Sequence, residues 1–164
     1  MKTLQQVINE NQIEIVIVSY DDTISTLGQE DGTRAYTELF LAGGARALIT
    51  TEGVKRVEVI DDLAKFIGVE RLNALIAHEV GHLILKHEAP ILANGLAGFI
   101  LEDELAADEY AASFSGKQVV SETIQGVLRW ALLGAMQMNN NSFVEAVQEN
   151  VKSSVIQQRL EALR

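Results

Sequence analysis

All three histidines of this 164-residue chain lie between His78 and His87, and that stretch begins with the five residues HEVGH. Residues four apart stack on one face of a helix, about one turn from each other, so on a helix His78 and His82 can hold one ion between them. Apolar residues cover most of the circumference of a helix drawn over residues 69–87, so we predict a long, buried helix there. The fold must then bring further ion ligands to one face of that helix.

Glu79, which follows the first histidine, is the glutamate of the HExxH pattern. It would sit beside the ion, where its carboxylate can take a proton from a zinc-bound water. Zinc can bring the pKa of such a water to about 7, so a carboxylate can complete the activation at neutral pH. The HExxH spacing is therefore typical of zinc hydrolases. The alternative is a surface helix with two solvated histidines, because short motifs also arise by chance.

Two histidines do not complete a zinc site, so the third ligand has to be found elsewhere. Metzincins carry a third histidine six residues after the second, but that position is Glu88 here. His87 lies about 140° around an unbroken helix from His82, so it cannot face the same ion unless the helix stops at once. We therefore expect a glutamate on a separate helix, which is the His₂Glu arrangement of thermolysin-like enzymes.

The acidic segment 101–112 offers such a glutamate. Glu104 and Asp108 are four apart and share a helix face that is otherwise made of small residues, so this face can lie close against the first helix. Asp108 would accept the second ring N–H of a ligand histidine and fix its tautomer. The alternative is that residues 102–104 are acidic only because a helix N-terminus favours negative charge, but this explains Asp108 poorly.

Both candidate metal motifs resemble those of a known family, the gluzincin zinc metallopeptidases of the HtpX and CAAX prenyl endopeptidase type. Ala77 to His82, followed by His87, resembles the family's AHExGHxxxxH. Glu104 to Asp108 is similar to its ExxAD, in which the glutamate binds zinc and the aspartate supports the ligands. Residues 49–54 resemble the strand and turn, I-x-T-x-G-L, that precede the next helix in the family. The resemblance covers roughly residues 33–164.

The chain departs from the family pattern near its C-terminus. Residues 153–160 resemble the family's HPxxxxRI, but only the arginine is kept, as Arg159, and Ser153 replaces the histidine. Stabilisation of the oxyanion would then fall to Arg159 or to a tyrosine such as Tyr110, unless Arg159 is a structural arginine that bonds carboxylates. Small soluble peptidases that cleave phage-type repressors carry similar motifs and form a second candidate family. Asp108, where those usually have asparagine, favours the first family.

Composition restricts the partners and the compartment. The formal net charge of -10 argues against binding to nucleic acid or to an anionic membrane surface. The lack of cysteine excludes disulfides and thiolate zinc ligands and suits the cytoplasm. The N-terminus lacks the apolar core of a signal peptide, and the apolar run from Pro90 to Leu101 is far shorter than the roughly 20 residues of a membrane helix. We expect one soluble domain over 1–164.

The first third of the chain predicts a small sheet. Residues 12–19 are rich in β-branched types and predict a strand. Residues 33–41 and 46–50 could pair as a hairpin across the turn at Gly43-Gly44. An edge strand in the region 33–50 could hold an extended substrate by β-augmentation.

The rest of the chain predicts helices. The pattern turns helical from Val54, with Asp61-Asp62 as a break or cap. Residues 90–98 predict an irregular connection with a turn at Asn94-Gly95. Further helices are predicted at about 101–115, 119–138 and 142–163. Five large apolar residues are expected in the core, namely Trp130, Leu132, Leu133, Met136 and Met138.

The sequence as a whole predicts an α+β fold, a mainly helical zincin-like domain with a small mixed β-sheet and an active-site helix that carries the HExxH motif. The predicted function is zinc-dependent endopeptidase, acting on a protein or peptide substrate. His78, His82 and Glu104 would hold one Zn²⁺ ion. Glu79 would be the general base, and Asp108 would hold a ligand histidine in place.

Two alternatives to an active peptidase remain open. In the first, the metal site is structural or regulatory and the domain binds a protein partner. An intact Glu79 argues against this alternative, because a purely structural site has no need of that carboxylate. In the second, the peptidase is latent because its C-terminal helices cover the cleft, and removal of the residues after Asn139 would raise its activity.

Overall fold

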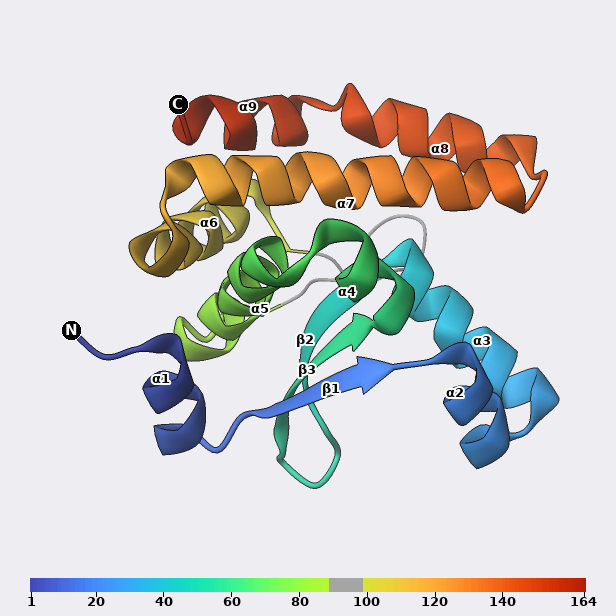
Figure 1. The fold of residues 1–164 in the computed structure, drawn as a ribbon, viewed down its shortest axis with the longest axis horizontal. Helices are drawn as coiled ribbons and strands as arrows, with labels where there is room; N and C mark the ends of the chain where they lie inside the picture. Colours follow the sequence, from blue (N-terminus) through green and yellow to red (C-terminus); the bar gives the residue numbers. More distant parts are fainter. Residues whose placement is uncertain (89–98) are drawn as a thin grey trace.

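The computed structural model describes residues 1–88 and 99–164, in which a small sheet is covered by a larger helical body (Figure 1). The helices are α1 (Leu4–Glu10), α2 (Tyr20–Leu27), α3 (Gln29–Leu41), α4 (Asp61–Ile67), α5 (Val69–Ile84), α6 (Leu101–Ser115), α7 (Lys117–Gln137), α8 (Asn141–Val151) and α9 (Ser154–Ala162). The strands are β1 (Glu14–Val18), β2 (Ala45–Ile49) and β3 (Lys55–Ile60). The predicted class, mainly helical with a small mixed sheet, agrees with this arrangement.

The sheet is mixed, with the strand order β1-β3-β2. β1 runs parallel to β3, and Val16 faces Glu58. β2 runs antiparallel to β3, and Ala47 faces Val57. The strand predicted at 12–19 is therefore present as β1, two residues shorter at its start and one at its end. Within the described residues, β2 forms one edge of the sheet, inside the region where the sequence predicts an edge strand.

The hairpin predicted between 33–41 and 46–50 is wrong, because the first of these segments lies within helix α3. The two glycines that suggested a hairpin turn instead end that helix, with φ angles of 96° at Gly43 and 84° at Gly44. Gly44 donates its backbone N–H to Leu39 and Gly43 donates to Phe40, which is the Schellman pattern of a helix C-terminus. A Cβ at Gly44 would lie 2.7 Å from the ring of Trp130, so this turn also needs glycine for space.

The prediction of helix from Val54 is also wrong, because residues 55–60 form strand β3. Val57 and Val59 are buried and alternate with charged residues, which is the period of a strand with one face on the core. The segment resembling I-x-T-x-G-L therefore contains the last residue of β2 and the turn into β3, and β3 follows it before the next helix. That helix, α4, begins at Asp61, as the paired aspartates predict.

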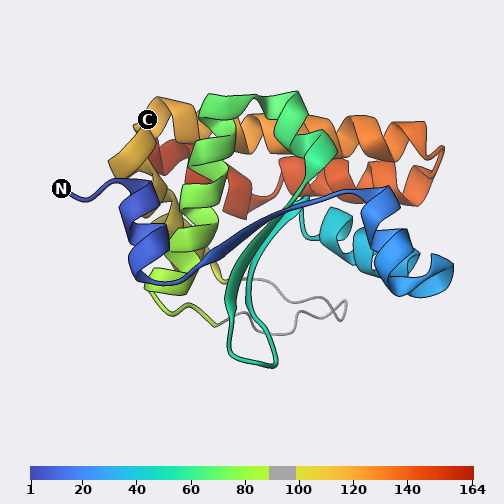
Figure 2. The ribbon, with the colours of Figure 1, turned by 60° about the horizontal axis from the view of Figure 1, so that its bottom comes forward.

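The helices stack in layers on the sheet. α5 packs against α7 on one side and against β2 and β3 on the other (Figure 2). α8 packs along α7, and α9 follows it and packs against α6 (Figure 1). The single helix predicted over 142–163 is wrong, because the chain breaks at 152–153 and Ser153 caps the start of α9. In the part of the chain that is described, no helix combines the length and the apolar character needed to cross a membrane.

The core lies between the sheet and the helices α4, α5 and α7. Trp130 is buried there as predicted, and its indole N–H donates to Asp62 at 3.0 Å. The prediction is wrong for Leu133, Met136 and Met138, which are exposed. Leu133 and Met136 are one turn apart on α7, with Met136 58% exposed, and Met138 is the C-cap residue of that helix. The turn predicted at Asn94-Gly95, within 90–98, lies outside the described residues.

Candidate metal centre

The HExxH residues lie in the second half of helix α5, and His78, Glu79 and His82 are buried there. The helix begins after Gly68, as predicted, but it ends at Ile84 and not at residue 87. Because the histidines are four apart, their rings project from one face of α5. A buried, fixed pair of imidazoles fits a ligand site and does not fit the alternative of two solvated histidines on a surface helix.

Helix α6 brings the second motif to that face. It covers residues 101–115, as predicted, and its buried residues are Ala107, Asp108 and Ala111. These small residues let α6 approach α5 closely. The approach is matched on α5 by Gly81, where a Cβ would lie 3.1 Å from the ring of Tyr110. Gly81 therefore allows α6 to pack closely against α5 here, with the ring of Tyr110 against the backbone of α5.

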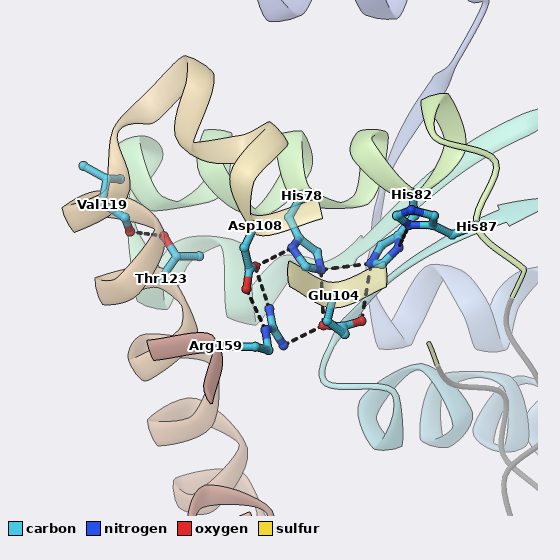
Figure 3. Close-up of polar contacts among 8 residues, drawn as sticks. All are labelled: His78, His82, His87, Glu104, Asp108, Val119, Thr123 and Arg159. Atoms are coloured by element: carbon cyan, nitrogen blue, oxygen red, sulfur yellow. Dashed lines mark hydrogen bonds and ion pairs between the residues drawn. The ribbon is translucent and has the colours of Figure 1, made fainter. Parts of the chain in front are cut away.

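The three predicted ligands meet between the two helices (Figure 3). His78 Nε2 lies 3.1 Å from His82 Nε2 and 3.6 Å from Glu104 Oε2. His82 Nε2 lies 3.4 Å from Glu104 Oε1. The ligand atoms of a tetrahedral zinc ion, each about 2.0–2.1 Å from the metal, are about 3.3–3.4 Å from one another. The three donors are thus spaced like three corners of such a tetrahedron, so the residues present fit a zinc ion.

The other nitrogen of His78 has a carboxylate partner. His78 Nδ1 lies 2.8 Å from Asp108 Oδ1, and this nearby carboxylate favours a proton on Nδ1, which leaves Nε2 free for an ion. The contact is an ion pair without hydrogen-bond geometry, so Nδ1 has no hydrogen-bond partner among the described residues. The guanidinium of Arg159, on helix α9, holds Asp108 from the other side with Nε and Nη2 at 2.8 Å from the two carboxylate oxygens. Its Nη1 lies 2.6 Å from Glu104 Oε2. Arg159 therefore belongs to the site, and its contacts are those of the structural alternative, an arginine that bonds carboxylates. A role for it in stabilising an oxyanion stays a prediction.

The charges buried in this site do not balance by themselves. Glu79, Glu104 and Asp108 contribute three negative charges, and Arg159 contributes one positive charge. With all three acids ionised and the histidines neutral, the site carries two excess negative charges in a region that is largely shielded from water. Buried charges are unfavourable unless they are compensated. A divalent cation between the three donors would bring the sum to zero, which is a second reason why the site fits zinc.

The pKa values of the acids follow from the same contacts. Burial raises the pKa of Glu79, and this effect outweighs the opposing charges of the two histidines. Burial would also raise the pKa of Glu104, but the hydrogen bond from His82 and the charge of Arg159 outweigh it and lower that pKa. Asp108 behaves in the same way, with burial outweighed by its bonds to Arg159 and His78, so its pKa is lowered. The site therefore contains one acid whose pKa is raised by burial and two acids whose pKa values are lowered by their partners.

One feature of the site is missing from the sequence prediction. His87 was excluded as a ligand on the assumption of an unbroken helix, and it is not part of the donor group. However, α5 ends early enough for the chain to fold back, so His87 Nδ1 lies 2.9 Å from Nδ1 of His82 (Figure 3). A glycine near residue 86 would have signalled such a turn, but that position is Lys86.

The chain has no match among models of known protein families, curated protein sequences or solved structures. The likeness to the gluzincin peptidases stays a prediction from the sequence motifs. The chemistry open to the site follows from its own residues, which are two imidazole nitrogens and a carboxylate with a further buried acid beside them. Such a group is suited to holding a divalent ion and to moving a proton next to it.

Proposed function

We propose that the chain is a zinc-dependent endopeptidase in which His78, His82 and Glu104 hold one zinc ion. The observation that supports this most is the spacing of the three donors, 3.1, 3.4 and 3.6 Å, which fits a tetrahedral ion. Two histidines and a glutamate form the ligand set of catalytic zinc sites in which a further position is left for water or substrate. The two excess negative charges of the site point to a divalent ion.

The residues around the ion would divide the chemistry between them. Zinc bound at this site would supply Lewis acidity, lowering the pKa of a water and polarising the scissile carbonyl. A carboxylate oxygen of Glu79 would take the proton of the attacking water and later give it to the leaving amine nitrogen. Because burial raises the pKa of Glu79, this carboxylate holds a proton more firmly than an exposed glutamate does. Asp108 would keep the ring of His78 turned so that Nε2 faces the other two ligands, His82 and Glu104.

The substrate would bind as an extended peptide along strand β2. Within the described residues β2 is an edge strand, so backbone N–H and C=O groups along it are free to pair with a further strand. β2 also packs against α5, the helix that carries His78 and His82. A peptide added to this edge would therefore run beside the helix that holds the site. We infer that the substrate is an unfolded segment, because a folded chain cannot offer an extended backbone.

The latent alternative finds less support in the geometry. In that alternative the C-terminal helices only cover the cleft, so their removal would raise activity. Helix α9, however, supplies Arg159, which binds the buried carboxylates of both Glu104 and Asp108. Removal of the residues after Asn139 would leave these acids without that cation. We therefore expect the truncated chain to be less stable and no more active than the full chain.

The proposal is tested by metal content and by hydrolysis measured on the same preparations. The purified protein should contain one zinc ion, and His78→Ala or His82→Ala should abolish binding. Glu79→Gln should keep zinc and fold but lose hydrolysis of an unfolded protein substrate, because an amide cannot take the proton from water. Glu102→Gln, an exposed glutamate at the start of α6, is the matched control and should keep both properties. Zinc retained by both histidine variants would refute the site, and turnover retained by Glu79→Gln would remove Glu79 from the mechanism.

A further inference from the structure

The outer nitrogen of His82 meets a second imidazole. His82 Nε2 faces Glu104 and His78, whereas its Nδ1 lies 2.9 Å from Nδ1 of His87 (Figure 3). When Nε2 of a neutral imidazole binds an ion, Nδ1 carries the proton and must donate it. His87 Nδ1 can accept that proton, provided that the proton of His87 is on its own Nε2. The two rings can therefore form an N–H···N hydrogen bond that fixes both tautomers.

A specific turn places His87 there. Leu85 is the C-cap residue of α5, and Lys86 takes the left-handed conformation with φ 58°. Lys86 donates its backbone N–H to the carbonyl of Leu83, and His87 donates its own to the carbonyl of His82 at 3.0 Å. These two bonds form a Schellman motif, which reverses the chain directly after the helix. His87 is thus tied to His82 through the backbone as well as through the ring.

Two further side chains hold this pair of rings. Asp103, at the start of α6, places Oδ1 3.6 Å from Nε2 of His87, so the negative charge favours a proton on that nitrogen. Phe99 stacks on the face of His82, with 3.6 Å between ring centroids and 8° between planes. The ring of His82 is therefore held at its edge by a hydrogen-bond acceptor and on its face by an aromatic ring.

We propose that His87, supported by Asp103, is a positioning residue that holds His82 with Nε2 directed at the ion. This inference rests on the proposed zinc site, and it assigns His82 a support different from that of His78. His78 is backed by the carboxylate of Asp108, whereas His82 is backed by a neutral imidazole. Partners of this kind commonly change metal affinity about 10–100-fold when they are removed.

The test compares substitutions that keep or remove the acceptor at residue 87. His87→Phe keeps an aromatic ring without nitrogen, and it should weaken zinc binding about 10–100-fold in a chelator competition titration. His87→Asn keeps an acceptor near the position of Nδ1, and it should recover most of the affinity. Asp103→Asn should lose less affinity than His87→Phe. Glu102→Gln, its exposed neighbour, is the control and should bind zinc like the wild type.

A spectroscopic measurement separates positioning from a general loss of structure. In zinc-loaded, ¹⁵N-labelled wild type, the Nδ1 proton of His82 should be protected from exchange, with a coupling between the two Nδ1 nuclei across the hydrogen bond. His87→Asn should keep the protected proton and lose the coupling, and His87→Phe should lose both. Wild-type affinity in His87→Phe, or absence of the coupling in the wild type, would overturn the role of His87 while leaving zinc binding and hydrolysis in place. A wild type that holds no zinc would overturn both this role and the proposed function.

Discussion

Replacing Arg159 by methionine removes a cation from two buried carboxylates while keeping a long, unbranched side chain. The guanidinium is only 13% exposed and makes contacts of 2.8, 2.8 and 2.6 Å with Asp108 and Glu104. Removing one partner of a buried ion pair destabilises a protein by about 3–5 kcal/mol, because the other charge is left without compensation. We expect a loss of this size in the free energy of unfolding of the zinc-free protein.

The loss should depend on zinc. In the zinc-free site Arg159→Met increases the excess negative charge from two to three, whereas with zinc it leaves a single negative charge. The destabilisation should therefore be smaller in the zinc-loaded protein. By thermodynamic linkage, the folded variant should then bind zinc at least as tightly as the wild type. This outcome distinguishes Arg159 from Asp108, whose removal should weaken zinc binding.

The assay is urea unfolding followed by the fluorescence of Trp130, the single and buried tryptophan. Arg71→Met is the matched control, because Arg71 pairs with Glu122 at 2.9 Å but is 42% exposed. Exposed pairs of this kind contribute about 0–1 kcal/mol. A loss below about 1 kcal/mol for zinc-free Arg159→Met would refute the reasoning, because it would put this pair in the class of exposed pairs.

The pH dependence gives a further check on the same variant. The pKa values of Asp108 and Glu104 are lowered below their ordinary values of 3.8 and 4.5 in the folded protein. Stabilisation by a lowered acid is complete above its ordinary pKa and is lost as the pH falls through the folded pKa. The difference in unfolding free energy between the wild type and Arg159→Met should therefore be full at neutral pH and shrink below about pH 4.

Three other predictions follow from the same structure. In chelator titrations Glu104→Ala should weaken zinc binding far more than Glu102→Ala, because only Glu104 faces the histidines; the reverse order would show that the predicted ExxAD match is accidental. Gly44→Ala should destabilise the fold by about 2–4 kcal/mol, because residue 44 has a positive φ and the new methyl group would lie 2.7 Å from the buried ring of Trp130. Gly53→Ala, which also has a positive φ but open space around it, should cost only about 1 kcal/mol. Glu79→Gln should stabilise the zinc-free protein at pH 7, because the raised pKa of Glu79 penalises its charged form. Denaturation curves should show this gain vanishing below pH 4.5, where the glutamate is protonated in both states.

The meeting of His78, His82, Glu104 and Asp108 could be predicted from the sequence because each pair is a spacing of four on one helix. That spacing fixes a common face whatever the rest of the chain does. The small residues of α6 then allow the two faces to approach each other, and these residues are visible in the sequence as well. The contacts of the four side chains therefore depend on local geometry and on one packing event between α5 and α6.

The elements before the site were harder to predict because their apolar runs are short. Residues 33–41 contain aromatic and β-branched residues that suit a strand, yet Tyr36, Leu39 and Phe40 are also spaced for one face of a helix. The pair Gly43-Gly44 fits either a hairpin turn or a helix C-terminus. Packing selects the helix C-terminus over the hairpin turn, because at Gly44 the chain must pass close to Trp130, which is 86 residues further along. Single-segment patterns do not contain that contact.

The case of His87 shows how one backbone turn changes the role of a residue. On an unbroken helix His87 would point away from His82, so the spacing of five excludes it from the ligand set. The turn at Lys86 keeps it out of the donor group but brings its ring to the far side of His82. A left-handed residue other than glycine costs roughly 1–2 kcal/mol, so nothing in the local sequence favours a turn at this lysine. Its stability must come from the contacts that it creates. Among the described residues these include the bonds of His87 to the ring and backbone of His82 and its contact with Asp103. If His82 binds an ion as proposed, the turn that follows α5 also places the ring of His87 where it can support that ligand.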